Sequence, residues 1–139
     1  MTLYAKWIPN SSPSRSYQAR VQGIGWQAPS YNGETTGTIG QKLRLESLKV
    51  SLSNLTQGLS GSHIQYQAFV QGIGWQNPSA NDGEIAGTIG QSKRMEAMRL
   101  QLTGPISQVY DVYYRVHVQN IGWMAWAKNW QISGTSGMS

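Results

Sequence analysis

One ten-residue segment occurs three times in this chain of 139 residues, and this repetition constrains the fold more than any other feature. Residues 17–26 read YQARVQGIGW, residues 66–75 read YQAFVQGIGW, and residues 114–123 read YRVHVQNIGW. The copies start 49 and then 48 residues apart. A repeat of this length is one supersecondary unit that buries its apolar face only against its neighbours. The sequence therefore predicts three similar units that share one core.

Two further blocks follow the repeated segment. A Gly-Thr-x-Gly motif stands at residues 37–40, 87–90 and 134–137. The blocks RLESLKVSL and RMEAMRLQL follow at residues 44–52 and 94–102, whereas the third copy reaches Ser139 before any such block. The third unit is therefore truncated.

These blocks predict a single domain of three repeats in residues 17–139, preceded by a leader strand and a linker in residues 1–16. The repeats span residues 17–64, 65–112 and 113–139. The linker is residues 10–16, which contain four Ser and one Pro. Such a composition favours an irregular connection over a helix or strand.

The apolar residues of each unit have a period of two. Tyr17, Ala19 and Val21 alternate with polar residues, and residues 48–52 alternate in the same way. Strict alternation is typical of half-buried β-strands and does not match the 3.6-residue period of a helix. We therefore expect an all-β chain.

Three units of short strands bury their apolar faces best by closing around a common axis. Two architectures satisfy this, a β-prism of three sheets and a β-trefoil of six hairpins. We favour the prism-like assembly with pseudo-threefold symmetry, because the strands look long and flat, and keep the β-trefoil as the alternative. A linear solenoid is less favoured, because both of its ends need caps.

Composition excludes several classes of protein. Without Cys the chain has no disulfide, thiolate zinc site or cysteine nucleophile. Its 11 Lys and Arg against 6 Asp and Glu give a formal net charge of +5, but no basic run marks a nucleic-acid arm. The apolar runs are too short to span a membrane. We therefore expect no nucleic-acid partner, no membrane insertion, no cofactor, no metal and no catalytic activity.

The motifs resemble a known repeat. V-Q-[GN]-I-G-W, A-G-T-x-G-Q and R-x-E-A-[IM] are similar to the clostridial hydrophobic repeat with a signature tryptophan, the ChW repeat. Residues 70–98 carry the resemblance most fully. The first copy departs from it at Thr36 and Ser47, and the third at Asn120 and in its missing last block. The resemblance implies a secreted or surface-displayed protein of Gram-positive bacteria, with a role in binding the cell wall, a polysaccharide or another cell.

The first residues allow two compatible interpretations. Residues 2–7, TLYAKW, resemble the last strand of the Listeria–Bacteroides surface repeat, which implies that the chain is a piece of a longer protein. Alternatively, residues 3–7 supply the strand that the third unit lacks and close the ring non-covalently.

Tryptophans are the first candidates for ligand contact. The signature residues Trp26, Trp75 and Trp123 end the repeated segment, and an indole offers a sugar ring a flat apolar face and an N–H donor. The alternative is that each fills the core beneath a glycine bulge. Trp126 and Trp130 occur only in the third unit, so symmetry does not require them, and both are candidates for ligand contact.

Polar side chains near these tryptophans are further candidates. They are Gln22, Gln71, Gln119, Asn32, Asn81 and Asp82. Amide and carboxylate groups match the donors and acceptors of sugar hydroxyls. However, Asn and Asp also occupy turns for backbone reasons, and the glutamines serve equally well in bonds between loops.

A charged pair recurs in the last block of the first two units. Arg44 and Glu46, like Arg94 and Glu96, stand two residues apart and so share one strand face, which is the apolar one. We expect an ion pair at the edge of the core. One carboxylate per unit does not suit glycoside hydrolysis, which uses two across the bond.

These observations predict a non-catalytic binding module, and the resemblance implies that it is extracellular, at the cell surface or in the cell wall. Its expected partner is a cell-wall polymer or polysaccharide, bound weakly at equivalent sites on three units and strengthened by avidity. The rival hypothesis is a protein–protein adhesion module that binds a partner protein or host surface with the same loops.

Overall fold

The structure, a computed structural model, describes residues 1–8, 14–53, 55 and 58–135. Its described part is all-β, as predicted, apart from the short 3-10 helix η1 (Pro105–Gln108). The long strands are β1 (Thr2–Ile8), β2 (Ser14–Val21), β6 (Leu45–Ser53), β7 (His63–Val70), β11 (Met95–Thr103) and β12 (Asp111–Val118). The short strands are β3 (Gly25–Trp26), β4 (Ser30–Tyr31), β5 (Thr35–Gly37), β8 (Gly74–Trp75), β9 (Ala80–Asn81), β10 (Ala86–Gly87), β13 (Gly122–Trp123), β14 (Ala127–Lys128) and β15 (Ser133–Gly134). Of the predicted linker, residues 10–13 lie outside the described residues, and Ser14 already begins β2.

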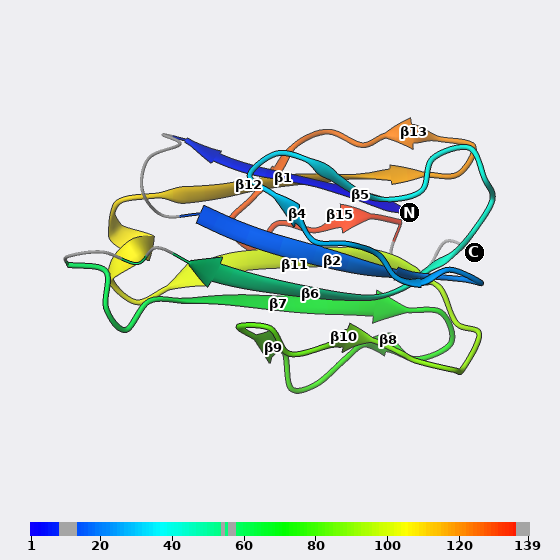
Figure 1. The fold of residues 1–139 in the computed structure, drawn as a ribbon, viewed down its shortest axis with the longest axis horizontal. Coiled ribbons are helices and arrows are strands. Elements are labelled where there is room, and N and C mark those ends of the chain that lie inside the picture. Colours follow the sequence, from blue (N-terminus) through cyan, green and yellow to red (C-terminus); the bar gives the residue numbers. More distant parts are fainter. Residues whose placement is uncertain (9–13, 54, 56–57, 136–139) are drawn as a thin grey trace.

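The strands form three antiparallel sheets with one common plan (Figure 1). Each is named here by its first long strand: the β2 sheet, the β7 sheet and the β12 sheet. The long strands pair as β2 with β6, β7 with β11, and β12 with β1. Two short strands of the same unit pair with the first long strand, as β3 and β4 do with β2. The expected assembly of three repeats is confirmed, and the preference for a prism over a trefoil stays a prediction.

β1 completes the β12 sheet. The third unit ends before a second long block, and all seven residues of β1 pair with β12 in its place. Leu3 pairs with Val116 in the register in which Leu48 pairs with Ala19 in the first unit. The prediction that residues 3–7 supply the missing strand is confirmed.

The fifth strand of each sheet comes from the following unit. β10 of the second unit pairs with β6 of the first, and β15 of the third unit pairs with β11 of the second. β5 of the first unit pairs with β1, which closes the cycle. Because every sheet needs a strand from another unit, no unit completes a sheet alone.

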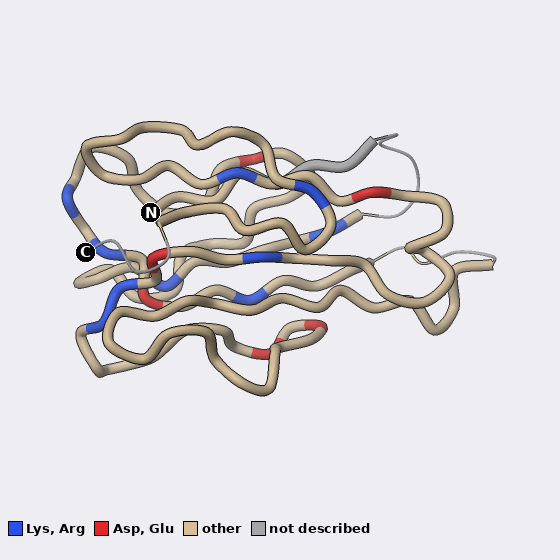
Figure 2. The backbone as a smooth tube through the Cα atoms, turned by 180° about the vertical axis from the view of Figure 1, so that it is seen from behind, with Lys and Arg blue, Asp and Glu red and all other residues tan. Residues whose placement is uncertain are grey.

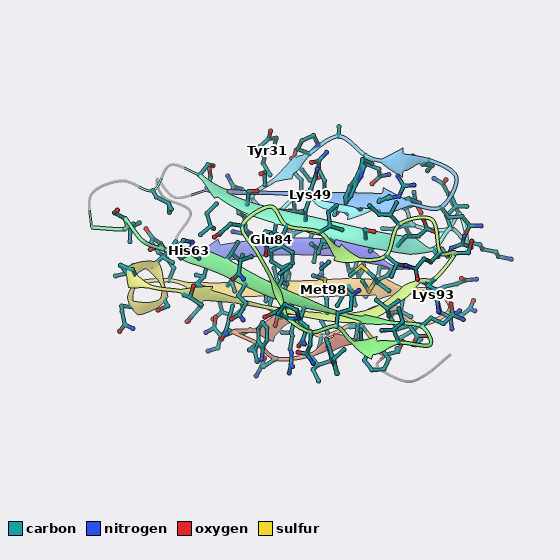
Figure 3. The ribbon with its side chains drawn as sticks, turned by 90° about the horizontal axis from the view of Figure 1, so that it is seen from below. Tyr31, Lys49, His63, Glu84, Lys93 and Met98 are labelled. Carbon is teal, nitrogen blue, oxygen red and sulfur yellow. The ribbon has the colours of Figure 1, made fainter. Side chains whose placement is uncertain are left out.

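One face of each long strand contributes to a shared core. Along β2 every second residue is buried, as the alternation of the sequence predicts. The equivalent residues Leu3, Leu48 and Met98 are almost fully buried. Met98 lies between the sheets in Figure 3, whereas Tyr31 of β4 stands at the outer margin.

A buried tyrosine in each unit fixes the loop that precedes the short fifth strand. The three are Tyr17, Tyr66 and Tyr114, each at most 1% exposed. Their hydroxyls donate to the backbone carbonyls of Glu34, Glu84 and Gln131, respectively. The Tyr66 hydroxyl also accepts from the backbone N–H of Val50 in the neighbouring unit, 3.1 Å away. The tyrosines therefore connect units as well as filling the core.

The exchanged strand passes very close to its acceptor. Gly87 of β10 has φ of 100°, and a Cβ there would lie 2.2 Å from the carbonyl oxygen of Glu46. Gly37 and Gly134 occupy the equivalent crossings with φ of 99° and 116°. Only glycine combines this backbone angle with this approach, which explains the first glycine of the Gly-Thr-x-Gly motif.

Replacement of Leu3 tests whether β1 belongs to the fold. Leu3→Ala should lower the free energy of unfolding by about 2–5 kcal/mol, because it leaves a cavity in a close-packed core. Leu48→Ala, at the equivalent position of the β2 sheet, should cost a similar amount. Urea denaturation of both variants measures this. If Leu48→Ala is destabilising and Leu3→Ala is silent, β1 is not part of the domain.

A pair of glycine variants tests the strand exchange. Gly87→Ala should destabilise the chain by about 2 kcal/mol or more, because it adds a steric clash to an unfavourable backbone angle. Gly90→Ala is the matched control. Its φ of 74° carries the same kind of backbone penalty, but nothing lies within 4 Å of the added Cβ, so about 1 kcal/mol is expected. Equal thermal destabilisation of the two variants would contradict the close approach of β10 to β6.

Candidate functional site

The three signature tryptophans lie on the outer faces of the sheets and are half-buried rather than part of the core. Each stands on a short strand that returns along the first long strand of its unit. A cation lies over each ring: Lys49 over Trp26, Arg99 over Trp75 and Arg115 over Trp123, at 4.6, 4.6 and 4.7 Å from the ring centroid. The repeated indole therefore pairs with a cation on an outer face and does not fill the core.

The richest aromatic cluster is on the β12 sheet. The Arg115 guanidinium lies 4.5 Å from the ring of Trp126, 4.7 Å from that of Trp123 and 5.2 Å from that of Tyr4. The Tyr4 ring meets Trp126 edge-to-face at 5.1 Å between centroids. Trp126 is 37% exposed, so part of its indole is open to solvent. This cluster joins β1 to the third unit and presents stacking surface outward.

Trp130 lies on the β7 sheet although it belongs to the third unit. Its ring lies 4.6 Å from the Arg99 guanidinium, which also contacts Trp75, so one cation contacts two indoles. Trp130 has φ of 80°. Gly33 and Gly83 hold the equivalent position in the other units with φ of 97° and 86°. A tryptophan in this left-handed conformation costs about 1–2 kcal/mol, which its contacts with Arg99 help to offset.

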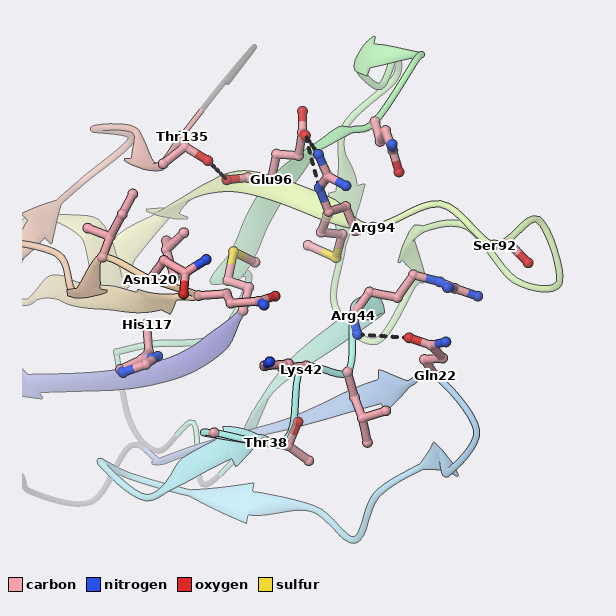
Figure 4. Close-up of a pocket in the computed structure, with 18 residues that line it drawn as sticks. Gln22, Thr38, Lys42, Arg44, Ser92, Arg94, Glu96, His117, Asn120 and Thr135 are labelled. Carbon is pink, nitrogen blue, oxygen red and sulfur yellow. Dashed lines mark hydrogen bonds and ion pairs between the residues drawn. The ribbon is translucent and has the colours of Figure 1, made fainter. Parts of the chain in front are cut away.

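The structure brings the three predicted glutamines together. Gln22, Gln71 and Gln119 line one cavity of about 640 Å³, at the end of the molecule where the loops of all three units meet. Lys42, Arg44, Arg94, Glu96 and His117 also line it, and the Lys42 side chain extends toward its middle in Figure 4. Gln22 Oε1 accepts from the backbone N–H of Arg44 at 3.3 Å, so at least this glutamine holds a loop. The cavity therefore combines amide groups with charged side chains, of which two arginines are ion-paired to glutamates.

The expected ion pairs are present, and each joins an arginine in the loop before β6 or β11 to a glutamate near the start of that strand. Arg44 Nε lies 2.7 Å from Glu46 Oε2, and Arg94 Nη2 lies 2.9 Å from Glu96 Oε2. Both glutamates are buried, and their strand positions belong to the edge of the core. The prediction of an ion pair there is confirmed.

The predicted loop residues have backbone roles. Asn32 Oδ1 accepts from the N–H of Arg15 at 2.9 Å, and Asp82 Oδ1 accepts from that of Ile64 at 3.0 Å. Both residues have positive φ, as the Asx turns of hairpins often do. Asn81 is exposed on β9. Asn32 and Asp82 thus hold turns beside the outer faces, and their contact with a ligand stays a prediction.

Sequence reasoning missed the cations of these aromatic clusters. Lys49, Arg99 and Arg115 are scattered along the sequence, and Arg115 comes from a different strand position than the other two. Only the cross-strand register places them beside indoles. Their alternation with core residues was the available signal, since it assigned them to the outer face.

Exposed isoleucines ring the end that holds the large cavity. Ile24, Ile73 and Ile121 occupy the G-I-G or N-I-G turns after the first long strands and are each about half exposed, and Ile39 and Ile89 occupy two Gly-Thr-x-Gly turns. Lys42, Arg44, Lys93 and Arg94 come from neighbouring loops, and Figure 2 shows basic residues gathered at the end where the chain begins. This end is both apolar and basic.

Among the described residues, no group of three or more His, Asp and Glu side chains is placed to hold a metal ion. Their one helical element is far too short to cross a bilayer. The outer-face clusters and the cavity contain aromatic rings for stacking, hydrogen-bonding groups and positively charged side chains.

Comparison with known proteins gives one family. The sequence model described as clostridial hydrophobic W matches residues 20–54, 69–104 and 117–139. No curated protein and no solved structure matches the chain. The three matched segments cover the three units seen in the structure, with the last one shorter, as the sequence predicts.

The buried tyrosines predict a loss of stability in alkali. Burial raises the pKa of Tyr66 and of Tyr114 from 10.0 to about 12. The folded state therefore holds these protons more tightly than the unfolded state, so their contribution is complete below pH 10 and is lost as the pH rises from 10 to about 12. Urea denaturation at a series of pH values should show this decline, and Tyr66→Phe should make it shallower. A free energy of unfolding that stays constant through this window would contradict the buried, neutral tyrosines.

Proposed function

The chain belongs to the clostridial hydrophobic W family, and from that premise we propose that it is a non-catalytic binding module for a cell-wall polymer or polysaccharide. The observation that carries the proposal is the presence of a partly exposed signature indole on the outer face of every sheet. Partly exposed indoles next to hydrogen-bonding side chains are the usual means by which proteins hold sugar rings, since the ring supplies apolar area and the polar groups supply orientation.

Each outer face would make a weak contact with the ligand. The cation above each tryptophan fixes the indole in one orientation, so less conformational entropy is lost on binding. Because the three sheets share one core and each has its own outer face, a long or branched polymer can meet more than one of them. Linked weak contacts on a polymer raise the overall affinity by avidity.

Net charge adds a second attraction. The formal charge of +5 favours association with anionic wall polymers such as teichoic acids, and this attraction falls as salt rises. The cavity that Gln22, Gln71 and Gln119 line also carries Lys42, which makes no ion pair in the described part of the chain, whereas Arg44 and Arg94 pair with glutamates. We place the module outside the cell, at the surface or in the wall, because such polymers are found there.

Protein–protein adhesion is the second candidate, and the exposed isoleucines favour it. An apolar ring of loop residues at one end of a domain is typical of an interaction surface. A protein partner would bind that end, whereas a glycan would bind the aromatic outer faces. The two functions therefore predict different sensitive residues.

Truncation of Trp126, the most exposed tryptophan among the described side chains, tests the proposal. Trp126→Ala should lower the fraction of the chain retained by purified peptidoglycan at low salt by roughly two- to tenfold, because one stacking contact is lost. Val109→Ala is the control, since Val109 is an apolar residue with 61% exposure at the end of η1 and belongs to none of the outer-face clusters. Its retention should equal that of the wild type.

The same pull-down distinguishes the competing accounts. Peptidoglycan with and without teichoic acid separates the stacking contribution from the charge contribution. No retention on either material at low salt would contradict the wall-binding function. If retention is unchanged in Trp126→Ala but lost in Ile73→Ser, the protein–protein adhesion hypothesis is favoured, with contact at the end that carries the exposed isoleucines.

A further inference from the structure

The three outer faces share one backbone plan but differ at one row of side chains. In the β2 sheet, Ser16 faces Ser51 and Gln18 faces Lys49. In the β7 sheet, the same positions are held by Gln65 facing Gln101 and by Gln67 facing Arg99. A residue from the next unit overlies each row: Gly83, bonded through its N–H to Val50, and Trp130, bonded in the same way to Leu100.

On the β7 sheet this row is filled by the protein itself. Gln101 Nε2 donates to Gln65 Oε1 at 2.6 Å, and the Arg99 Nε and Nη2 atoms donate to Gln67 Oε1 at 2.9 and 2.6 Å. The Trp130 ring covers Arg99. The polar side chains of this row therefore bond to one another, and the Trp130 indole covers them.

On the β2 sheet the same place is a hollow of about 220 Å³. It is lined by Ser16, Tyr17, Gln18, Lys49, Ser51 and Gly83. Two serines and a glycine stand where the other face has two glutamines and a tryptophan, so the missing side-chain volume accounts for the hollow. A Cβ added at Gly83 would lie 3.2 Å from Ser51 Oγ, so any larger residue at this position enters the hollow.

The β12 sheet offers no copy of this hollow. Tyr113 stands at the position of Ser16, and Tyr4 stands at that of Lys49, with Arg115 against the Tyr4 ring. Bulky aromatic groups thus replace the small and flexible side chains of the β2 sheet. Symmetry relates the backbones, but only one described face has the open row.

We propose that the hollow of the β2 sheet binds a single sugar residue of a glycan. This inference rests on the proposed function and assigns it a site. Its volume lies below the roughly 300–1,000 Å³ of pockets that enclose drug-sized ligands, and suits one monosaccharide unit of a longer chain that continues into solvent.

The lining has the chemistry that sugar hydroxyls require. The Ser16 and Ser51 hydroxyls donate and accept, and the Lys49 ammonium donates. Gln18 Nε2 donates to the carbonyl of Gln27 at 2.9 Å, and no donor in the described part of the chain reaches its Oε1, unlike that of Gln67. A bound hydroxyl group supplies this missing donor.

The signature tryptophan lies next to this hollow. Lys49 lines the hollow, and its Nζ is 4.6 Å from the Trp26 ring centroid. The corresponding Arg99 contacts both Trp75 and Trp130. We infer that the ligand sits on Lys49 as the Trp130 ring sits on Arg99, so that Trp130 is a built-in occupant of the sister site.

Variants that exchange the two faces test this assignment. Ser16→Gln/Ser51→Gln gives the β2 sheet the side chains that the β7 sheet already accommodates, and should lower the affinity for muropeptides released from peptidoglycan by a muramidase roughly tenfold, measured by titration calorimetry. The matched control Gln65→Ser/Gln101→Ser makes the reverse change on the filled face. It should leave the affinity as it is, because Trp130 still covers that face.

Two further variants keep the test informative if the glutamine substitutions disturb folding. Ser16→Ala/Ser51→Ala removes only the hydroxyls, so it remains informative if the larger side chains disturb folding, and it should weaken binding several-fold. Gln65→Ser/Gln101→Ser/Trp130→Gly rebuilds the open row on the β7 sheet. It should raise the number of muropeptides bound per chain by one.

The outcomes separate the assignment from the function. If the wild-type chain binds neither muropeptides nor intact peptidoglycan, the wall-binding function fails and the assignment fails with it. If the wild type binds muropeptides but both Ser16/Ser51 variants bind equally well, the function stands and the hollow is not the site. Weaker binding in those variants with an unchanged Gln65→Ser/Gln101→Ser control supports the assignment.

Discussion

The pairing of β1 with β12 is the interaction on which the rest of this structure depends. Every sheet includes a short strand from the following unit. The cycle is complete only if the last sheet has a strand with which the short strand of the first unit can pair. β1 is that strand, since it pairs with β12 on one side and with β5 on the other. β1 and the third unit thus form one sheet, although β1 and β12 are far apart in the sequence.

The periodicity of the sequence predicted the strands well, but it could not predict which strands pair or in which register. The alternation around Tyr17 and the triple recurrence of the ten-residue segment led to the all-β, three-unit assembly and to the Arg44–Glu46 ion pair. The exchange of the short strand between units was not predicted, because the Gly-Thr-x-Gly motif does not indicate which strand it pairs with. For the same reason the cations over the signature indoles were missed, since register alone brings Lys49 to Trp26.

The core keeps the symmetry that the outer faces have lost. Tyr17, Tyr66 and Tyr114 occupy equivalent core positions, and each hydroxyl donates to a backbone carbonyl, because a close-packed core tolerates little variation. Outward-facing positions carry no such constraint, so Gly83 has its counterpart in Trp130 despite the backbone strain. Differences between otherwise equivalent faces therefore indicate where the three faces can differ in ligand contact, in addition to the indoles that they share.

The central claim, that β1 is an integral strand of a closed ring, is tested most directly by hydrogen exchange. The amides of β1 that pair with β12 should exchange as slowly as those of β6 and β11, because all three strands occupy the same place in equivalent sheets and open only on global unfolding. Protection of β6 and β11 together with rapid exchange throughout β1 would contradict the account, because the ring would then open without unfolding the rest.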